Sequence, residues 1–147
     1  MATTKILMVC LGNICRSPLA QGILEKKVFK SVIIDSAGTA GYHIGENPDQ
    51  RSIDIGNKNG VDISNFKARQ FSKEDFKNFD HIYVMDNSNY KDVINQAESI
   101  EDEKKVNLIL PSNQEVPDPY YHGEKGFEHC YRLLDNACEN ILKELNL

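Results

Sequence analysis

Hydrophobic residues along the chain form two kinds of pattern that alternate. Short continuous apolar runs, typical of strands buried on both faces, cover residues 5–9, 32–35, 81–85 and 106–110. Apolar residues at helical spacing, or helix-start signals, predict helices at residues 17–29, 49–59, 72–79, 87–97 and 127–145. Because strands and helices alternate, we expect one α/β domain over residues 1–147, with a four-stranded parallel sheet and helices on both faces.

The loops that follow the strands are where chemistry is expected, because ligands of parallel sheets bind beyond the carboxyl ends of the strands. Two such loops stand out, at residues 10–17 and 116–123. In the first, Gly12 and Asn13 are the residues best able to adopt positive φ. A loop wound this way turns its backbone N–H groups inward to bind an anion, and Arg16 adds a planar fork for two phosphate oxygens.

Cys10 lies where the first predicted strand runs into this loop. The following helix, expected to have Pro18 at its first position, and the Arg16 side chain both favour a thiolate nearby. A lone cysteine after a strand is more often a small buried hydrophobe. Cysteine, glycine, asparagine, arginine and Ser-Pro within one turn instead favour a nucleophile at the floor of a phosphate-sized pocket. The loop lacks the glycine patterns of dinucleotide and Walker-type sites.

Residues 10–16 read C-x5-R, the signature of cysteine-dependent phosphatases, within the longer string VCLGNICRSP. This string resembles the low-molecular-weight protein tyrosine phosphatases. Further strings typical of that family follow in order: DSAGT at 35–39, ARQFSKEDF at 68–76, MDNSN at 85–89 and DPYY at 118–121. The resemblance runs nearly end to end. It implies hydrolysis of phosphotyrosine in proteins, and of aryl phosphomonoesters, by an acid-phosphatase-like enzyme with this phosphatase loop after its first strand.

Three residues carry the chemistry that the resemblance implies. Cys10 attacks phosphorus and forms a phosphocysteine intermediate, Arg16 grips the equatorial oxygens, and Asp118 acts as general acid and then as general base. Phosphoryl transfer needs positioning and charge stabilisation more than covalent help, so these assignments agree with the physics. On local sequence alone, Asp118 is also typical of a plain turn residue, because prolines flank it on both sides.

The resemblance assigns phosphate and substrate binding to a larger set: Leu11, Gly12, Asn13, Ile14, Cys15, Ser17, Tyr42 and Tyr120. Ser17 is expected to hydrogen-bond the sulfur, and Ser36 to help Asn13 hold the loop in shape. Tyr42 matches a variable aromatic wall of the family's pocket, although locally it is equally a surface tyrosine. A histidine that often supports the loop asparagine is absent from residues 64–67, so the support around Asn13 is expected to differ.

Cys15 has two interpretations, a small buried filler or a redox partner of the nucleophile. The resemblance implies that Cys15 traps oxidised Cys10 as a disulfide, which would make the enzyme redox-regulated. It also implies that Tyr120 and Tyr121 are possible phosphorylation or dimer-contact sites. No cofactor or metal is expected, because the loop amides and Arg16 supply the positive field. The histidines have no assigned role and are taken as surface or packing residues: His43, His81, His122 and His129.

Composition limits the classes of partner that the protein is expected to bind. Lys and Arg number 17 against 22 Asp and Glu, and the resulting net charge of −5 argues against nucleic-acid binding by bulk charge. No apolar run approaches the roughly 18 residues of a membrane span, and no secretory signal is recognisable, so we expect a cytoplasmic protein with reduced thiols. The expected partners are phosphotyrosine proteins, small aryl phosphates, and inorganic phosphate or other oxyanions, with the chain as a monomer or weak dimer.

Two other functions compete with this interpretation. Arsenate reductases share the fold and the C-x5-R loop, but they need two further cysteines to relay a disulfide. Cys130 and Cys138 are the only candidates, and eight residues of helix separate them by about 12 Å, beyond disulfide reach. A silent phosphotyrosine-binding module would be expected to have lost the nucleophile, the arginine or the acid, and all three are present.

Overall fold

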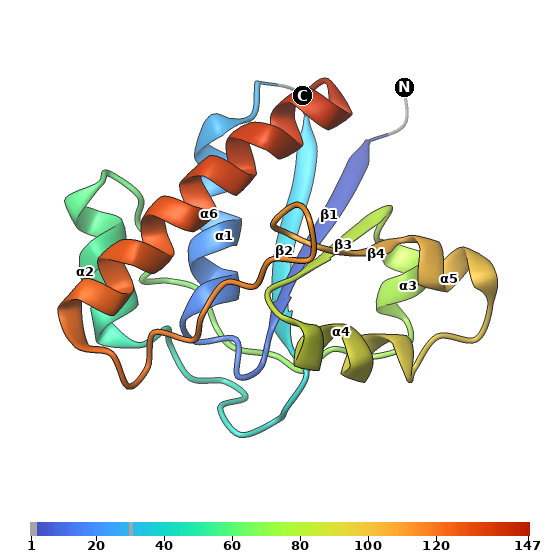
Figure 1. The fold of residues 1–147 in the computed structure, drawn as a ribbon, viewed down its shortest axis with the longest axis horizontal. Coiled ribbons are helices and arrows are strands. Elements are labelled where there is room, and N and C mark those ends of the chain that lie inside the picture. The colour runs from blue at the N-terminus through green and yellow to red at the C-terminus, as the bar shows by residue number, and fades with distance from the viewer. Residues whose placement is uncertain (1–2, 30) are drawn as a thin grey trace.

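The four strands form one parallel sheet in the order β2-β1-β3-β4, as Figure 1 shows in the computed structural model, which describes residues 3–29 and 31–147. The strands are β1 (Thr4–Cys10), β2 (Val32–Gly38), β3 (His81–Val84) and β4 (Val106–Leu108). The helices are α1 (Arg16–Lys27), α2 (Gln50–Lys58), α3 (Asp75–Asn78), α4 (Asn87–Ile94), α5 (Ile100–Lys104) and α6 (Gly123–Leu145). This confirms the predicted α/β fold with a four-stranded parallel sheet.

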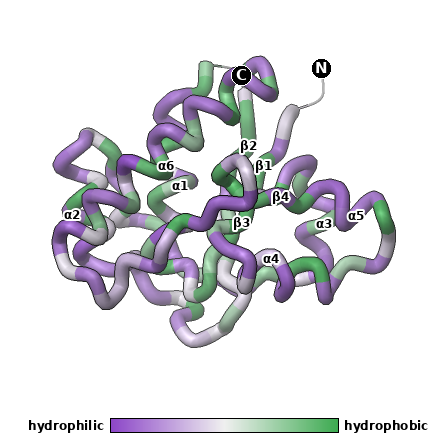
Figure 2. The backbone as a smooth tube through the Cα atoms, in the orientation of Figure 1, coloured by the Kyte–Doolittle hydropathy of each residue, from purple (hydrophilic) through white to green (hydrophobic). Residues whose placement is uncertain are grey.

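Strand β1 lies at the centre of the molecule, and its side chains alternate between two cores. Ile6, Met8 and Cys10 face the core beneath α1, α2 and α6, whereas Leu7 and Val9 face the core beneath α3 and α4. Figure 1 shows these two groups of helices on opposite sides of the sheet. All five residues are at most 2% exposed, which explains why the sequence shows a continuous apolar run here instead of an alternating one. The inner strands are accordingly among the most hydrophobic parts of the tube in Figure 2.

Helix α1 begins one residue before the predicted range. It starts at Arg16, so the prediction that Pro18 occupies the first helical position is wrong, and Pro18 is its third residue. A proline is tolerated there because the N–H groups of a first turn have no partner within the helix. The helix ends at Lys27, short of Phe29, which is 94% exposed and therefore gives no reason to continue it.

Several other boundaries differ from the predictions by a few residues. Strand β2 continues beyond residue 35 to Gly38, because it pairs with β1 in parallel register as far as Cys10. Helix α5 was not predicted, although Ser99 caps it by accepting a hydrogen bond from the backbone N–H of Asp102. The helix expected over residues 72–79 is the single turn α3.

Helix α6 presents the apolar stripe that the sequence predicts. Its buried members include Phe127, Cys130, Tyr131, Leu134, Cys138 and Ile141. The stripe packs against α1, where the Cys138 thiol donates to the carbonyl oxygen of Ala20 at 3.7 Å. Both cysteines of α6 are thus core residues. Within the described parts of the chain, we find no helix with the length and apolar character to cross a membrane.

Candidate active site

A pocket of about 270 Å³ opens where the two predicted loops meet, beyond the carboxyl end of β1. Its lining combines both loops with a third segment: Cys10, Leu11, Gly12, Ile14, Cys15, Arg16, Tyr42, His43, Asp118, Tyr120 and Tyr121. A larger cavity, of about 570 Å³, lies between β4 and α6, but neither a cysteine nor a basic residue lines it. The smaller pocket is therefore the site where a thiol, a guanidinium and a carboxylate come together.

The loop from Cys10 to Arg16 turns sharply at Asn13, which has a φ of 57° as predicted. The prediction for Gly12 is wrong, because Gly12 does not adopt positive φ. Gly12 instead leaves room for His43: a Cβ atom there would lie 3.0 Å from Cδ2 of His43, so the imidazole would have to shift. Beneath the loop, Gly38 allows a similar close approach, since its Cβ would lie 2.7 Å from the carbonyl oxygen of Leu11.

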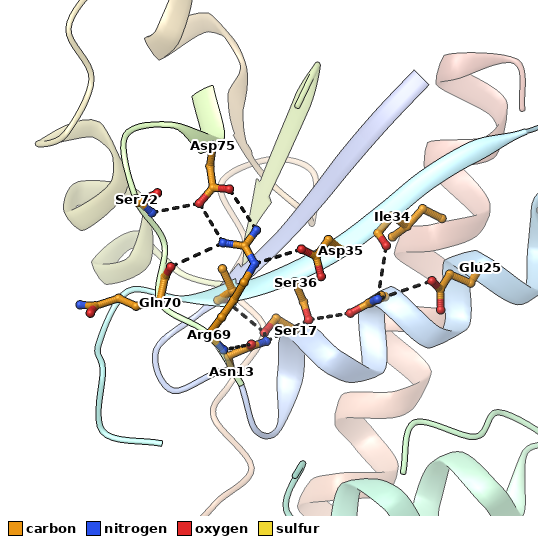
Figure 3. Close-up of polar contacts among 12 residues, drawn as sticks. Asn13, Ser17, Glu25, Ile34, Asp35, Ser36, Arg69, Gln70, Ser72 and Asp75 are labelled. Atoms are coloured by element: carbon orange, nitrogen blue, oxygen red, sulfur yellow. Dashed lines mark hydrogen bonds and ion pairs between the residues drawn. The ribbon is translucent and has the colours of Figure 1, made fainter. Parts of the chain in front are cut away.

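The Asn13 side chain holds this turn through all of its amide atoms. Its Nδ2 donates to Ser17 Oγ at 2.7 Å and to Ser36 Oγ at 2.9 Å, and its Oδ1 accepts from the backbone N–H of Arg69 at 3.0 Å. Figure 3 shows these contacts in one buried cluster. Ser36, as expected, contacts Asn13, and the backbone of Arg69 adds a second contact that the sequence did not predict.

The Arg69 guanidinium is itself fixed by two carboxylates, which keeps its backbone in place (Figure 3). It donates to both carboxylate oxygens of Asp75 at 3.0 and 3.1 Å, and through Nε to Asp35 at 3.0 Å. Asp75 also accepts from the backbone N–H of Ser72 at 2.9 Å. Burial lowers the pKa of Arg69, but the two carboxylates outweigh it and raise the pKa above its ordinary value.

Cys10 lies at the floor of the pocket, 2% exposed, with its sulfur 3.1 Å from Ser17 Oγ. The loop wraps around this sulfur and leads into the N-terminus of α1, whose first N–H groups lack partners within the helix. No atom of the described residues accepts a hydrogen bond from the backbone N–H groups of residues 11–15. Those groups are therefore available to an oxyanion bound above the thiol.

The Arg16 guanidinium is buried, at 3% exposure, and one of its nitrogens is committed to the protein. Nη1 donates to Asp86 Oδ2 at 2.7 Å and to the carbonyl oxygen of Val116 at 2.9 Å. A guanidinium has five N–H donors, so Nη2 and Nε keep three for a ligand. Burial lowers the pKa of Arg16, but Cys10, Asp86 and Asp118 outweigh it and raise the pKa above its ordinary value, so the group stays charged.

Asp118 lies at the mouth of the pocket, where its side chain is 45% exposed. Its Oδ2 is 3.8 Å from Nη2 of Arg16, and its Oδ1 accepts from the backbone N–H of Tyr120 at 3.1 Å. Arg51 steadies this loop, because it donates to the Tyr120 carbonyl oxygen at 2.8 Å and is held in turn by Asp49 at 2.9 Å. The acid candidate thus faces the same space as the thiol and the guanidinium.

Aromatic side chains form the outer walls of the pocket. Tyr42 is 75% exposed, Tyr120 is 40% exposed, and Tyr121 is 88% exposed. Tyr120 and Tyr121 meet edge to face with ring centroids 5.0 Å apart. His43, which the sequence left without a role, also lines the pocket and contacts Glu46 at 3.0 Å.

Cys15 lines the pocket but is 5% exposed. Burial, followed by the charge of Asp49, raises the pKa of its thiol well above the usual range, so Cys15 is protonated at neutral pH. Burial also raises the pKa of Cys130 and of Cys138 to about 12. In the part of the chain that the structure describes, we find no group of three or more histidine, cysteine or carboxylate side chains arranged to hold a metal ion.

Asp86, Val116, Arg51 and Arg69 are the supporting residues that reasoning from the sequence missed. Asp86 and Arg69 lie within strings that carry the family resemblance, MDNSN and ARQFSKEDF, and that was the only signal for them. A buried thiol, unpaired loop amides and an arginine with free donors together define the oxyanion site of a cysteine-dependent phosphatase.

Comparison with known proteins agrees with this class. The family model "Low molecular weight phosphotyrosine protein phosphatase" matches residues 5–147. The chain is 40% identical to a protein of that name from Schizosaccharomyces pombe, over 96% of both chains. A crystal structure of a protein tyrosine phosphatase from Entamoeba histolytica, with Hepes in its active site, is 38% identical with a TM-score of 0.91 and covers 98% of this chain and 97% of that one.

Vibrio vulnificus Wzb, solved in complex with benzylphosphonate, is 31% identical with a TM-score of 0.89 and covers 97% of this chain and 99% of that one. The chain belongs to the low molecular weight phosphotyrosine protein phosphatase family. It is accordingly a hydrolase.

Proposed function

We propose that the protein hydrolyses phosphotyrosine in proteins, and small aryl phosphates, in two steps through a phosphocysteine intermediate. The observation that carries this proposal is the convergence of Cys10, Arg16 and Asp118 on one pocket of about 270 Å³. The benzylphosphonate complex of the Vibrio relative supports it, since that ligand joins an aromatic ring to a phosphate-like group.

In the first step the Cys10 sulfur attacks phosphorus, an S–P bond forms, and the P–O bond to the aryl group breaks. The Nε and Nη2 donors of Arg16 and the free N–H groups of residues 11–15 hold the equatorial oxygens, where charge must be stabilised. Asp118 gives its proton to the departing phenolate. Because tyrosine is a leaving group with a pKa near 10, general acid catalysis at this point is worth roughly 10²–10⁴-fold.

In the second step Asp118, now a carboxylate, takes a proton from water as the water attacks phosphorus. The S–P bond breaks, inorganic phosphate leaves, and the sulfur returns to the thiolate. Ser17, whose hydroxyl oxygen is 3.1 Å from the sulfur, donates a hydrogen bond that eases this departure. No metal is required by this scheme, because Arg16 and the loop amides provide the positive charge.

Tyr42 and Tyr120 are proposed to hold the aromatic ring of the substrate. Both line the pocket beyond the thiol, and their exposure of 75% and 40% leaves ring surface for stacking. Such aromatic contacts are worth about 0.5–1.5 kcal/mol beyond simple burial. They favour an aryl phosphate over phosphoserine, which has no ring to stack against them.

Release of phosphate from p-nitrophenyl phosphate and from a phosphotyrosine peptide, in the presence of a chelator, tests the proposal. Cys10→Ser is expected to abolish turnover but to retain the fold and vanadate binding, because the amides of the loop remain. Asp118→Ala is expected to slow alkyl-substituted phenyl phosphates more than nitrophenyl phosphate, since the more basic leaving group needs the proton more. Equal losses for both substrates would exclude Asp118 as the acid. Binding of phosphotyrosine without turnover in the parent protein would indicate a silent binding module.

A further inference from the structure

A line of buried polar side chains leads from the back of the phosphate loop to the reactive sulfur. Gln21 on α1 accepts from Ser36 Oγ at 2.7 Å, and Ser36 Oγ accepts from Asn13 Nδ2 at 2.9 Å. Asn13 Nδ2 also donates to Ser17 Oγ at 2.7 Å, and Ser17 Oγ lies 3.1 Å from Cys10 Sγ. Because the exposed fraction of these residues ranges only from 0 to 7%, solvent does not set the hydroxyl orientations.

Two backbone groups that contact Asn13 and Gln21 fix the donor and acceptor of each hydrogen bond between the side chains. The N–H of Arg69 can only donate, so the Asn13 atom facing it at 3.0 Å must be Oδ1, and Nδ2 must face the serines. The carbonyl oxygen of Ile34 can only accept, so the Gln21 atom facing it at 3.3 Å must be Nε2, and Oε1 must face Ser36. Figure 3 labels Arg69 and Ile34, the residues to which these two backbone groups belong.

The hydroxyl protons follow from these two constraints. Ser36 donates its single hydroxyl proton in a hydrogen bond to Gln21 Oε1. The lone pairs of Ser36 Oγ therefore accept the hydrogen bond from Asn13 Nδ2. Ser17 likewise accepts from Asn13 and keeps its own proton for another acceptor. The nearest acceptor for it is the Cys10 sulfur, 3.1 Å away.

A competing acceptor for the Ser17 proton lies close by. The carbonyl oxygen of Ala37 is 3.4 Å from Ser17 Oγ, against 3.1 Å for Cys10 Sγ. The position of the Asn13 amide decides between them, because its N–H occupies one Ser17 lone pair and so limits the directions left to the Ser17 proton. Without Gln21, the Ser36 hydroxyl could rotate and loosen its contact with Asn13 Nδ2, the amide would shift against Ser17, and Ser17 would divide its proton between sulfur and carbonyl.

We propose that Gln21 is a positioning residue of the active site, which acts through Ser36 and Asn13 to direct the Ser17 hydroxyl proton at the Cys10 sulfur. Gln21 touches neither substrate nor sulfur. Its effect is to stabilise the thiolate before attack and the departing sulfur afterwards. The inference rests on the proposed function only in taking Cys10 as the nucleophile.

The test is the pH dependence of Cys10 alkylation by iodoacetamide, followed by mass spectrometry without substrate. Gln21→Met keeps the length of the side chain but offers Ser36 only a weak sulfur acceptor. Loss of one hydrogen bond in the line is expected to move the alkylation midpoint upward by about 0.4 to 1 pH unit and to slow alkylation roughly three- to tenfold below it. Gln96→Met, outside this cluster, is the control for the substitution itself.

A second set of variants keeps the test decisive if Gln21→Met is unstable. Ser36→Ala removes the same step, so it is expected to shift the midpoint in the same direction. The double variant Gln21→Met, Ser36→Ala should shift no further than Ser36→Ala, because Gln21 acts only through Ser36. An unchanged alkylation profile in a folded Gln21→Met protein, or additive shifts in the double variant, would overturn the proposal. Alkylation reports on the sulfur alone, so absent phosphatase activity would contradict the proposed function and leave this result standing.

Discussion

Replacing Asp86 with asparagine is expected to weaken phosphate binding and turnover by releasing the Arg16 guanidinium. Asp86 uses both carboxylate oxygens: Oδ2 accepts from Arg16 Nη1 at 2.7 Å, and Oδ1 accepts from the backbone N–H of Asn89 at 2.8 Å, which caps α4. An asparagine side chain has one oxygen for these two donors. Either Arg16 or the helix cap must therefore face an NH₂ group.

The magnitude follows from the contact that is lost. A hydrogen bond to a charged group contributes about 1.5–3 kcal/mol, so loss of the contact to Arg16 corresponds to roughly 10- to 100-fold in kcat/KM. The carbonyl oxygen of Val116 still holds Nη1 at 2.9 Å, which keeps the effect below complete loss. If the asparagine oxygen turns toward Arg16 instead, the cost appears as a lower Tm through the lost cap, about 1 kcal/mol.

Steady-state kinetics with phenyl phosphate and inhibition by inorganic phosphate measure the effect, and a thermal melt accounts for the helix cap. We expect the inhibition constant of phosphate to rise together with the fall in kcat/KM, because the arginine binds the same oxygens in both. Asp92→Asn, the same substitution on the exposed face of α4, is the matched control. If a folded Asp86→Asn protein has the same kcat/KM, the same inhibition constant of phosphate and the same Tm as the parent, Asp86 does not hold the guanidinium.

Two further changes test other parts of the molecule. Burial raises the pKa of Tyr83 to about 12, so the unfolded state ionises first as the pH rises above 10, and folding stability is lost there. Between pH 8 and pH 11 the free energy of unfolding of Tyr83→Phe, measured with urea, should therefore fall by about 1 kcal/mol less than that of the parent. Equal falls would show that Tyr83 ionisation does not cause the loss. Mild peroxide should inactivate the enzyme through a Cys10–Cys15 disulfide that dithiothreitol reverses. Cys15→Ser should inactivate at a similar rate but recover poorly, and equal recovery would show that Cys15 only packs.

The sequence was sufficient to predict the elements whose signals are local. The continuous run at β1 predicted a strand buried on both faces, and residues 6–10 are buried on both. Cys10 and Arg16 share a single turn, so their spacing alone placed a thiol and a cation at one site. Asp118 could be predicted to lie at that site only because parallel strands direct the loops that follow them to the same edge of the sheet.

The supporting contacts could not be predicted, because they join residues far apart in the chain. Asp86 reaches Arg16 across 70 positions, Arg51 reaches Tyr120 across 69, and the Arg69 backbone reaches Asn13 across 56. No periodicity or spacing encodes such pairs. The error at Gly12 has a related origin, since both Gly12 and Asn13 tolerate positive φ, and the close approach of His43 to Gly12 joins residues 31 positions apart.

The position of the phosphate loop after the central strand explains how these distant contacts all reach it. Cys10 pairs in register with Gly38 of β2, and Val9 pairs with Val84 of β3, so the residues around both strand ends lie beside the loop. Ser36 from the β2 side holds Asn13, and Asp86 from the β3 side holds Arg16. A loop after an edge strand would have one such neighbour, and either the turn or the arginine would lack its support. The strand order β2-β1-β3-β4 therefore provides the rigidity on which a preorganised oxyanion site depends.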